Sequence, residues 1–345
     1  MAQQQPLYNI GLFRSSEKNT DTQLNVNVSD KHFKIDLFTA DFESSPTLLA
    51  EYLRHVERVD PEYIPSEIDE DGEFEDPLDE MHDWVLQPFL PIFCQLAPLD
   101  PSRKYTLEDC LFAEEFHYTV QVVEGSLVPV RLSNSKCERK NYLIGARLPS
   151  STHVDYPMFP VYLPSEIQVP IEANSTSLPA VPPKVFIHGR SKPSFFKIVY
   201  AGDAGITMKE LLAYSKIHMA RFDATVYTSR LDGLVQDSNG YTMGLLLSYI
   251  DCRGTTLRCI GLSPKHSEFR QKWFDQISRT LQHLHSHNIV WGDAKAANVL
   301  IDVNWDAYLI DFGGGYTKGW VEKEMANSID GDLQGLANIK RFLFE

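Results

Sequence analysis

Apolar residues recur at helical spacing in two stretches of the first hundred residues. Between residues 48 and 59 they recur every three or four positions, directly after a capping serine and a first-turn proline at Ser45-Pro46. This pattern predicts an amphipathic helix. A similar spacing over residues 84–96 is interrupted by Pro88 and Pro91, which predicts a kinked or split helix, because proline lacks the amide hydrogen that a helix interior needs.

Strand-like alternation of apolar and polar residues appears at 116–122 and again at 127–132, on either side of Glu124-Gly125. This predicts a β-hairpin. Residues 1–32 are polar and lack sustained periodicity, so we expect a flexible leader with no more than one short strand. Residues 33–160 then read as an α+β accessory domain of unassigned role.

An acidic run divides this accessory region. Twelve acidic residues fall between Asp60 and Asp83, and no lysine or arginine occurs between Arg58 and Arg103. Charges of one sign repel each other and stay hydrated, so we interpret 60–83 as a solvated loop. The alternative is a docking site for a basic partner.

The pattern of apolar and polar residues changes near residue 161. Short β-type runs occupy 166–169, 185–188, 195–199, 226–231 and 241–250, with one helix expected at 208–220. A long helix follows, because Phe269, Trp273, Ile277, Leu281 and Leu284 share one face, and short strands are expected at 289–291, 299–302 and 308–310. Residues 173–183, rich in serine, threonine and proline, predict a flexible connection.

Composition narrows the kinds of partner and compartment. The chain has 345 residues and a net charge of −15, which argues against nucleic acid or an anionic membrane as the main partner. Its five cysteines are widely spaced and form no Cys-x-x-Cys pair, which favours reduced thiols. The sequence shows neither a signal peptide nor a run of roughly 18 apolar residues, so we expect an intracellular protein, cytoplasmic or nuclear.

Two short motifs carry chemistry. In Asp293-x-Lys295-x-x-Asn298 a carboxylate and an amide stand at the two ends of one tight loop, with a lysine between them. The carboxylate can accept the proton of an attacking hydroxyl, the amide oxygen can bind magnesium, and the lysine can offset charge on a transferred phosphoryl group. Asp311 follows a β-type run and precedes glycines, as suits a second magnesium ligand beside a mobile segment.

These motifs lie in the runs NIVWGDAKAANVLID and YLIDFGGG, which resemble the catalytic loop and metal-binding triplet of eukaryotic protein kinases. The sequence pattern as a whole resembles that of the atypical fungal kinase-like proteins. The resemblance covers roughly 161–345. It implies an α+β, bilobal protein-kinase-like fold, with a β-rich N-lobe at 161–250 and a helical, shortened C-lobe at 251–345, preceded by the α+β accessory region.

The resemblance also implies cofactors, ATP and Mg²⁺, and roles for individual residues. Asp293 would be the catalytic base, Lys295 would contact the transferred phosphoryl group, and Asn298 and Asp311 would bind magnesium. Lys197 would contact the α and β phosphates and pair with Glu210. The remaining positions are the gatekeeper Leu247, the adenine-binding hinge Ser248, Tyr249 and Ile250, the structural triplet members Phe312 and Gly313, and the brace Asp332.

Local interpretations compete with some of these roles. Thr207-x-x-Glu210 also fits a capping box, in which Glu210 would serve only the helix end. His283, His285 and His287 read as a solvated helix end in preference to a metal site. The run Gly313-Gly314-Gly315 follows the metal carboxylate without opening a helix, so we interpret it as flexible rather than as a phosphate loop.

Three departures from the kinase pattern keep the function open. Residues 170–184, where a glycine-rich loop is expected, contain no glycine. Trp291-Gly292 replaces the usual His-Arg pair, which argues against control by loop phosphorylation. No Ala-Pro-Glu motif closes the segment after Asp311. The leading hypothesis is a phosphotransferase with Ser/Thr-type acceptors; the alternatives are an ATP-binding scaffold, or pseudokinase, and a small-molecule kinase, with the protein partner unknown.

Overall fold

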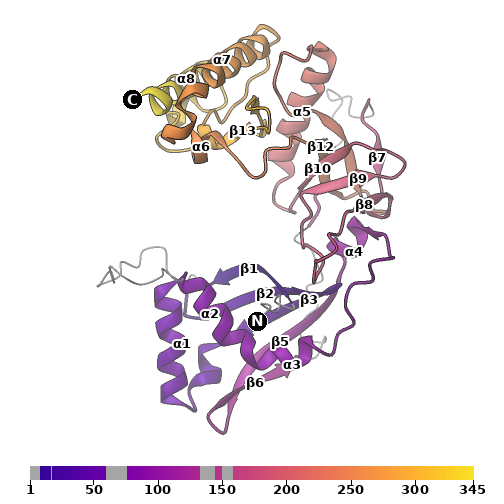
Figure 1. The fold of residues 1–345 in the computed structure, drawn as a ribbon, viewed down its shortest axis with the longest axis vertical. Coiled ribbons are helices and arrows are strands. Elements are labelled where there is room, and N and C mark those ends of the chain that lie inside the picture. The colour runs from indigo at the N-terminus through magenta and orange to yellow at the C-terminus, as the bar shows by residue number, and fades with distance from the viewer. Residues whose placement is uncertain (1–7, 17, 60–75, 133–143, 150–157) are drawn as a thin grey trace. The chain divides into compact units, whose positions relative to one another are not determined.

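The computed structural model describes residues 8–16, 18–59, 76–132, 144–149 and 158–345, which form two compact units (Figure 1). The first unit comprises residues 1–140 and 170–182, and the second comprises 141–169 and 183–345. The expected boundary at residue 161 therefore differs from the observed one, because each unit takes in a segment from the other side of it. Residues 60–75 of the acidic run lie outside the described residues.

A five-stranded sheet forms the first unit. Its strands lie in the order β1 (Asn9–Ser15), β2 (Thr22–Val28), β3 (Lys31–Leu37), β5 (Glu114–Val123) and β6 (Ser126–Arg131). Strands β3 and β5 are parallel, and the other neighbours are antiparallel. The remaining elements of this unit are α1 (Pro46–Arg58), α2 (Pro77–Leu86), α3 (Leu90–Phe93), β4 (Tyr105–Thr106) and α4 (Leu107–Leu111).

Helices α1 and α2 cover one face of this sheet (Figure 1). The predicted helix at 48–59 is confirmed as α1, whose cap is the Ser45 side chain, which accepts a bond from the amide of Leu48. The predicted split near Pro88 and Pro91 is confirmed as well, because the chain passes from α2 through a 3₁₀ turn at Gln87–Phe89 into α3. The hairpin prediction is confirmed by β5 and β6.

The flexible leader is the first correction. Residues 9–15 and 22–28 are strands of the sheet, and Leu24, Val26 and Val28 lie in the core of the first unit. Asparagines alternate with these apolar residues, and Asn25 and Asn27 are themselves buried. This alternation is itself a strand signal, but the polar composition of residues 1–32 as a whole hid it, and β2 pairs with β3 across a two-residue turn.

The second unit begins with a mixed sheet. In this unit its strands lie in the order β8 (Ile167–Val169), β9 (Lys184–Ile187), β10 (Pro193–Ile198), β12 (Thr242–Ser248), β11 (Leu231–Gln236) and β7 (Val161–Tyr162). All neighbours are antiparallel except β11 and β7. Helix α5 (Ala204–Ala220) follows β10 and contributes Leu211, Tyr214 and Ile217 to the core.

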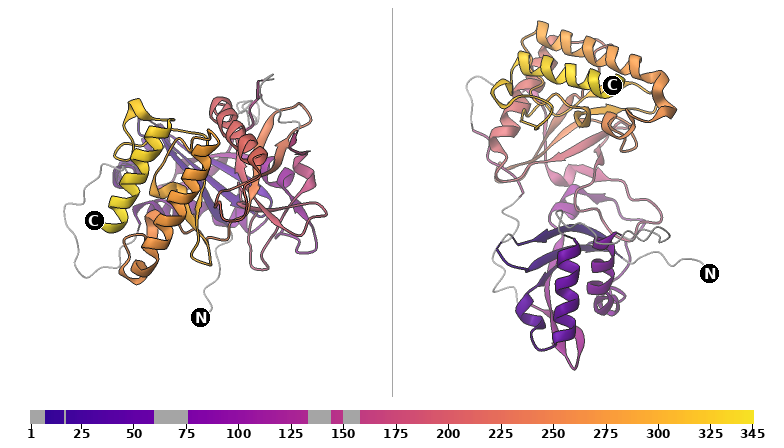
Figure 2. Two further views of the ribbon diagram at one scale, coloured as in Figure 1. Left: turned by 90° about the horizontal axis from the view of Figure 1, so that it is seen from above. Right: turned by 90° about the vertical axis from the view of Figure 1, so that its left-hand side faces the viewer.

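A helical lobe follows in the same unit. It contains α6 (Leu257–Ile260), α7 (Arg270–Ser286), the two-stranded sheet of β13 (Val299–Ile301) and β14 (Ala307–Leu309), and α8 (Ile329–Phe344). Helices α7 and α8 lie side by side, as Figure 2 shows. The apolar face predicted for α7 is buried, since Trp273, Ile277, Leu281 and Leu284 are at most 1% exposed.

Two strand predictions in this unit are wrong. The strand expected at 226–231 lies at 231–236, where Gly233 brings the Pro160–Tyr162 segment close: a β-carbon there would meet the Tyr162 ring at 2.7 Å. Residues 289–291 form no strand, because the amide of Trp291 bonds to a side chain on α8. Within the described residues, no helix is long and apolar enough to cross a membrane.

Candidate active site

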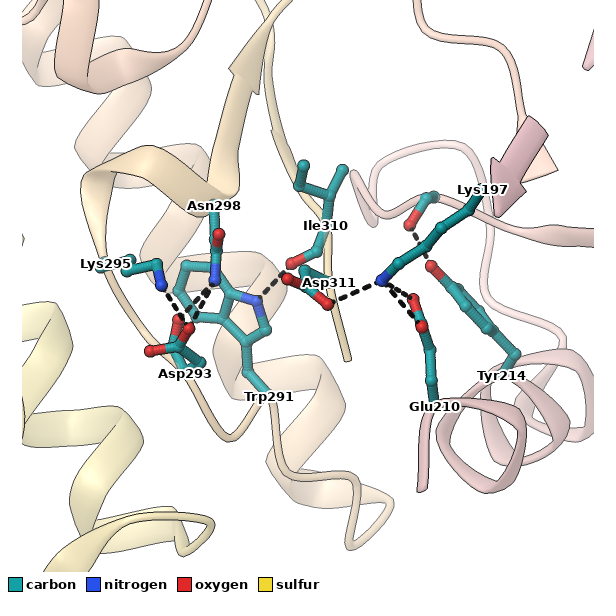
Figure 3. A network of polar contacts seen from close by, with 10 residues as sticks. Lys197, Glu210, Tyr214, Trp291, Asp293, Lys295, Asn298, Ile310 and Asp311 are labelled. Carbon is teal, nitrogen blue, oxygen red and sulfur yellow. Dashed lines mark hydrogen bonds and ion pairs between the residues drawn. The ribbon is translucent and has the colours of Figure 1, made fainter. Parts of the chain in front are cut away.

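Lys197, Glu210 and Asp311 meet in the second unit from three separate elements (Figure 3). Lys197 lies on β10, Glu210 on α5, and Asp311 shortly after β14. The Lys197 ammonium donates to both Glu210 carboxylate oxygens at 2.8 and 2.9 Å, and to Oδ1 of Asp311 at 2.8 Å. One cation is thus shared by two carboxylates that are 101 residues apart in the sequence, at 210 and 311.

Burial affects the two partners of this pair differently. Glu210 is only 2% exposed, and burial raises the pKa of its carboxyl group against the opposing charge of Lys197. Burial alone would lower the pKa of Lys197, but the two carboxylates outweigh it, so the pKa of this lysine is raised. A charged lysine held in place suits contact with an anionic ligand.

The capping-box interpretation of Glu210 is wrong. Helix α5 begins at Ala204 with Asp203 in the cap position, so Thr207 lies inside the helix and cannot cap it. The carboxylate of Glu210 instead contacts Lys197. The sequence pattern was ambiguous because the helix begins four residues earlier than expected, and its start decides between the two interpretations.

Asp293 lies in the loop before β13, where three side chains contact its carboxylate. Oδ2 accepts bonds from the ammonium of Lys295 and, at 3.1 Å, from the amide nitrogen of Asn298. Oδ1 accepts a 3.0 Å bond from the hydroxyl of Thr317. Asp293 is 8% exposed, and these three contacts fix the orientation of its carboxylate, as a general base requires.

Thr317 is a site residue that the sequence pattern did not reveal. Its hydroxyl accepts a 2.8 Å bond from Lys295 and donates to Asp293, so it closes a ring of three side chains. Thr317 lies six positions after Asp311, beyond the glycine run, in a segment without regular structure. A single threonine in such a segment gives no periodic signal, and only the fold brings it to Asp293.

Asp332 holds the backbone of the loop that begins at Trp291. This residue of α8 is 1% exposed, and its carboxylate accepts bonds from the amides of Trp291 at 2.8 Å and Gly292 at 2.7 Å. His285 Nε2 lies 2.9 Å from the same carboxylate. The prediction that the three histidines form a solvated helix end is therefore wrong for His285. The described residues contain no group of three or more His, Cys, Asp or Glu side chains suited to a metal.

Trp291 and Gly292 have structural roles where the kinase pattern has His-Arg. Trp291 is fully buried and its indole nitrogen donates to the carbonyl of Ile310 at 2.8 Å, which ties the loop to the residue before Asp311 (Figure 3). Gly292 has φ +92, and a β-carbon there would lie 3.0 Å from the α-carbon of Gly314. Both the backbone conformation and the close approach favour glycine at this position.

Phe312 and Gly313 connect Asp311 to helix α5. Phe312 is 2% exposed and its ring meets that of Tyr214 edge to face, with centroids 5.6 Å apart. A β-carbon on Gly313 would lie 2.7 Å from Ile206 Cγ2. Both contacts are with residues of α5. They fix the position of Asp311 relative to the helix that carries Glu210.

The predicted gatekeeper and hinge lie at the end of β12. Leu247 is 5% exposed and pairs with Phe195 of β10. The amide of Ser248 donates to the carbonyl of residue 230 at 2.7 Å, and the carbonyl of Ile250 accepts from the amide of residue 252 at 2.9 Å, so these two backbone groups have partners within the protein. The Lys184 ammonium lies 5.0 Å from the ring centroid of Tyr249.

The donor set fits a nucleotide with magnesium. Asn298 directs its amide nitrogen at Asp293, to the backbone carbonyl at 3.0 Å and to the carboxylate, which leaves its amide oxygen for a cation. Asp311 keeps 42% of its side chain exposed although one oxygen contacts Lys197. Oxygen ligands of this kind are the ones that Mg²⁺ prefers, and it usually completes its shell with phosphate oxygens.

Comparisons with known proteins agree with this geometry. Residues 231–334 match the protein kinase domain family. Mitogen-activated protein kinases mpkC of Neosartorya fischeri, Aspergillus fumigatus and Aspergillus clavatus are each 41% identical to this chain over 61 residues, which is 17% of this chain and 16% of theirs. The matched segment thus spans about a sixth of the length of these relatives.

The fold and the match together define a class of protein. The second unit has a protein-kinase-like fold, with a sheet and α5 in one lobe and mainly helices in the other. These findings support a relationship of the second unit to the protein-kinase-like superfamily.

Proposed function

We propose that this chain is an ATP- and magnesium-dependent phosphotransferase with a hydroxyl acceptor, nominally a serine or threonine of a protein. The observation that carries this proposal is the carboxylate of Asp293, which is oriented by Lys295, Asn298 and Thr317. A carboxylate held in this way is suited to orient a hydroxyl and to accept its proton. The lysine beside it is suited to offset charge on the transferred phosphoryl group.

The proposed roles divide the site into a nucleotide part and an acceptor part. Lys197, positioned by Glu210, contacts the α and β phosphates, and Asp311 and Asn298 bind magnesium. Bound magnesium would supply charge neutralisation at the phosphates. Residues 247–250 contact the adenine, and Asp293 receives the proton of the acceptor.

The test is phosphate transfer from radiolabelled ATP, together with ATP hydrolysis, which needs no identified acceptor. Asp293→Asn keeps the size of the side chain but removes the base, and we expect a loss of about 100-fold or more in turnover, within the range usual for general bases. Asp275→Asn, at an exposed position on α7, is the matched control and keeps full activity. Equal turnover by wild type and Asp293→Asn would contradict the proposal.

An ATP-binding scaffold is the second candidate. It is favoured by the stretch 170–184, which lacks the glycines that normally let backbone amides approach phosphates. A scaffold of this kind binds Mg-ATP without turnover. Binding to the folded state raises the melting temperature, so a nucleotide-induced shift that persists in Asp293→Asn, with no turnover in the wild type, would favour it.

A small-molecule kinase is the third candidate, since the pair Gly292-Asp293 resembles that of aminoglycoside and choline phosphotransferases. Turnover with hydroxylated metabolites but not with a peptide library would favour it.

We further propose an intracellular location, cytoplasmic or nuclear. Cys94, Cys110, Cys252 and Cys259 are free thiols in the part of the chain that the structure describes, as a reducing compartment would keep them. Fluorescence imaging of the tagged full chain tests this, and secretion into the medium would contradict it.

A further inference from the structure

The connection between strands β8 and β9 belongs to the first unit, although both strands belong to the second. Strand β8 ends at Val169 and β9 begins at Lys184, and residues 170–182 between them are part of the first unit. The connection occupies the place in the chain where a glycine-rich loop was expected. The prediction of a flexible connection at 173–183 is contradicted by the burial and bonding of its middle residues.

Contacts within the first unit anchor the connection at residues 176–178. The amide of Ser29 donates to the carbonyl of Thr176 at 3.2 Å, and the amide of Leu178 donates to the carbonyl of Ser29 at 2.8 Å. Asn9 on β1 donates to the hydroxyl of Ser177 at 2.8 Å. Ser177 and Leu178 are 2% and 4% exposed. The middle of the connection is therefore bonded to the turn between β2 and β3.

The pairing between the two strands that the connection joins is short. Strand β8 has three residues and β9 has four, and their pairing covers two positions, Ile167 with Ile187 and Gln168 with Phe186. Strand β9 also pairs with β10 at three positions, whereas β8 is held within the second unit by these two positions, and closing a long loop costs entropy. Bonding the middle of the connection removes conformational freedom from the loop, which lowers the entropy cost of the paired arrangement.

Strand β9 is the direct neighbour of the strand that carries Lys197. Ser194 on β10 pairs with Val185 on β9, three positions before Lys197. The order of β8 and β9 therefore affects the sheet that carries Lys197, the proposed phosphate contact. The connection itself has no glycine, so its backbone amides are not suited to approach phosphates closely. Its effect on a bound nucleotide therefore comes through strands β8 and β9.

We propose that the first unit is a regulatory domain for the nucleotide site, and that it acts through the anchored connection 170–182. With residues 176–178 bonded to the turn at Ser29, β8 and β9 are held in order and nucleotide binds more tightly. Release of the anchor lets the hairpin loosen and weakens binding. Because such coupling is reciprocal, nucleotide binding in turn stabilises the anchor. This inference rests on the proposed nucleotide binding.

The experiment measures Mg-ADP binding to the full chain by calorimetry. Leu178→Ser replaces the buried anchor side chain and is expected to weaken binding about fivefold or more, the lower end of common coupling strengths. Val181→Ser, at an exposed position of the same connection, is the control and is expected to change affinity by less than about twofold, as surface substitutions usually do. Circular dichroism checks that both variants remain folded.

A measurement on the wild type keeps the proposal testable if Leu178→Ser does not fold. Hydrogen exchange at the amides of Ser29 and Leu178 is expected to slow about fivefold or more when Mg-ADP is added. Unchanged exchange, or equal affinity in Leu178→Ser and wild type, would overturn the regulatory proposal while leaving nucleotide binding intact. A wild type that binds no Mg-ADP would instead overturn the proposed function, and this inference with it.

Discussion

The hydroxyl of Thr317 donates a 3.0 Å hydrogen bond to Oδ1 of Asp293 across 24 positions of the sequence. It also accepts a bond from Lys295, so the threonine orients both the proposed base and the proposed phosphate contact. The segment after Asp311 thereby contacts the loop that carries Asp293 and Lys295.

Thr317→Val removes the hydroxyl and keeps the shape of the side chain. Because hydrogen bonds to charged groups contribute roughly 1.5–3 kcal/mol, we expect the turnover number for ATP hydrolysis to fall by about 10- to 100-fold, with the KM for ATP little changed. Thr317→Ser keeps the hydroxyl and is expected to recover most of the activity. Steady-state kinetics measure both, and equal losses in the two variants would show that the hydroxyl is not responsible.

Asp332→Asn removes one of the two carboxylate oxygens that accept the amides of Trp291 and Gly292. One buried amide then faces an NH₂ group, so the free energy of unfolding is expected to fall by about 1–3 kcal/mol. Urea unfolding measures the change. Asp330→Asn, exposed on the same helix, is the control, and a comparable loss there would argue against the bracing role.

Gly292→Ala tests the close approach of the catalytic loop to Gly314. The backbone conformation at φ +92 and the 3.0 Å approach to the Gly314 α-carbon both oppose a β-carbon, and together they are expected to cost about 2–3 kcal/mol. Gly189→Ala has a similar φ of +78 but open space around it, so it isolates the conformational cost of about 1 kcal/mol. Thermal unfolding compares the two, and equal shifts would exclude an effect of the close approach.

His82 is expected to make the stability of the first unit depend on pH. Its ring is buried, and neither ring nitrogen has a hydrogen-bond partner among the described residues. Burial lowers its pKa although Asp79, Asp83 and Asp76 oppose the shift. The folded state therefore takes up a proton less readily than the unfolded state, so stability is full above the unfolded pKa of about 6.5 and is lost as the pH falls below it.

His82→Leu is expected to make the free energy of unfolding fall less between pH 7.5 and pH 5 than it does in the wild type. His188→Leu, at an exposed position, is the control for the substitution itself. Urea unfolding at the two pH values measures the difference. An identical pH dependence in wild type and His82→Leu would show that this histidine does not couple protonation to folding.

The sequence by itself determined the elements that depend on the spacing of neighbouring residues. The cap and proline before α1, the apolar face of α7 and the hairpin of β5 and β6 follow from the spacing of neighbouring residues. The grouping of Asp293, Lys295 and Asn298 was equally predictable, because all three lie within one tight loop. So short a loop leaves little freedom in how such side chains are arranged.

Only the tertiary structure decided the relationships that span long stretches of chain. The expected leader at 1–32 is a different case, because β1, β2 and β3 pair in sequence order and only the polar composition hid them. Thr317 reaches Asp293, His285 reaches Asp332, and residues 176–178 join the first unit because the fold brings distant segments together. Such contacts depend on the pairing of remote strands and helices, and no local spacing of residues encodes that pairing.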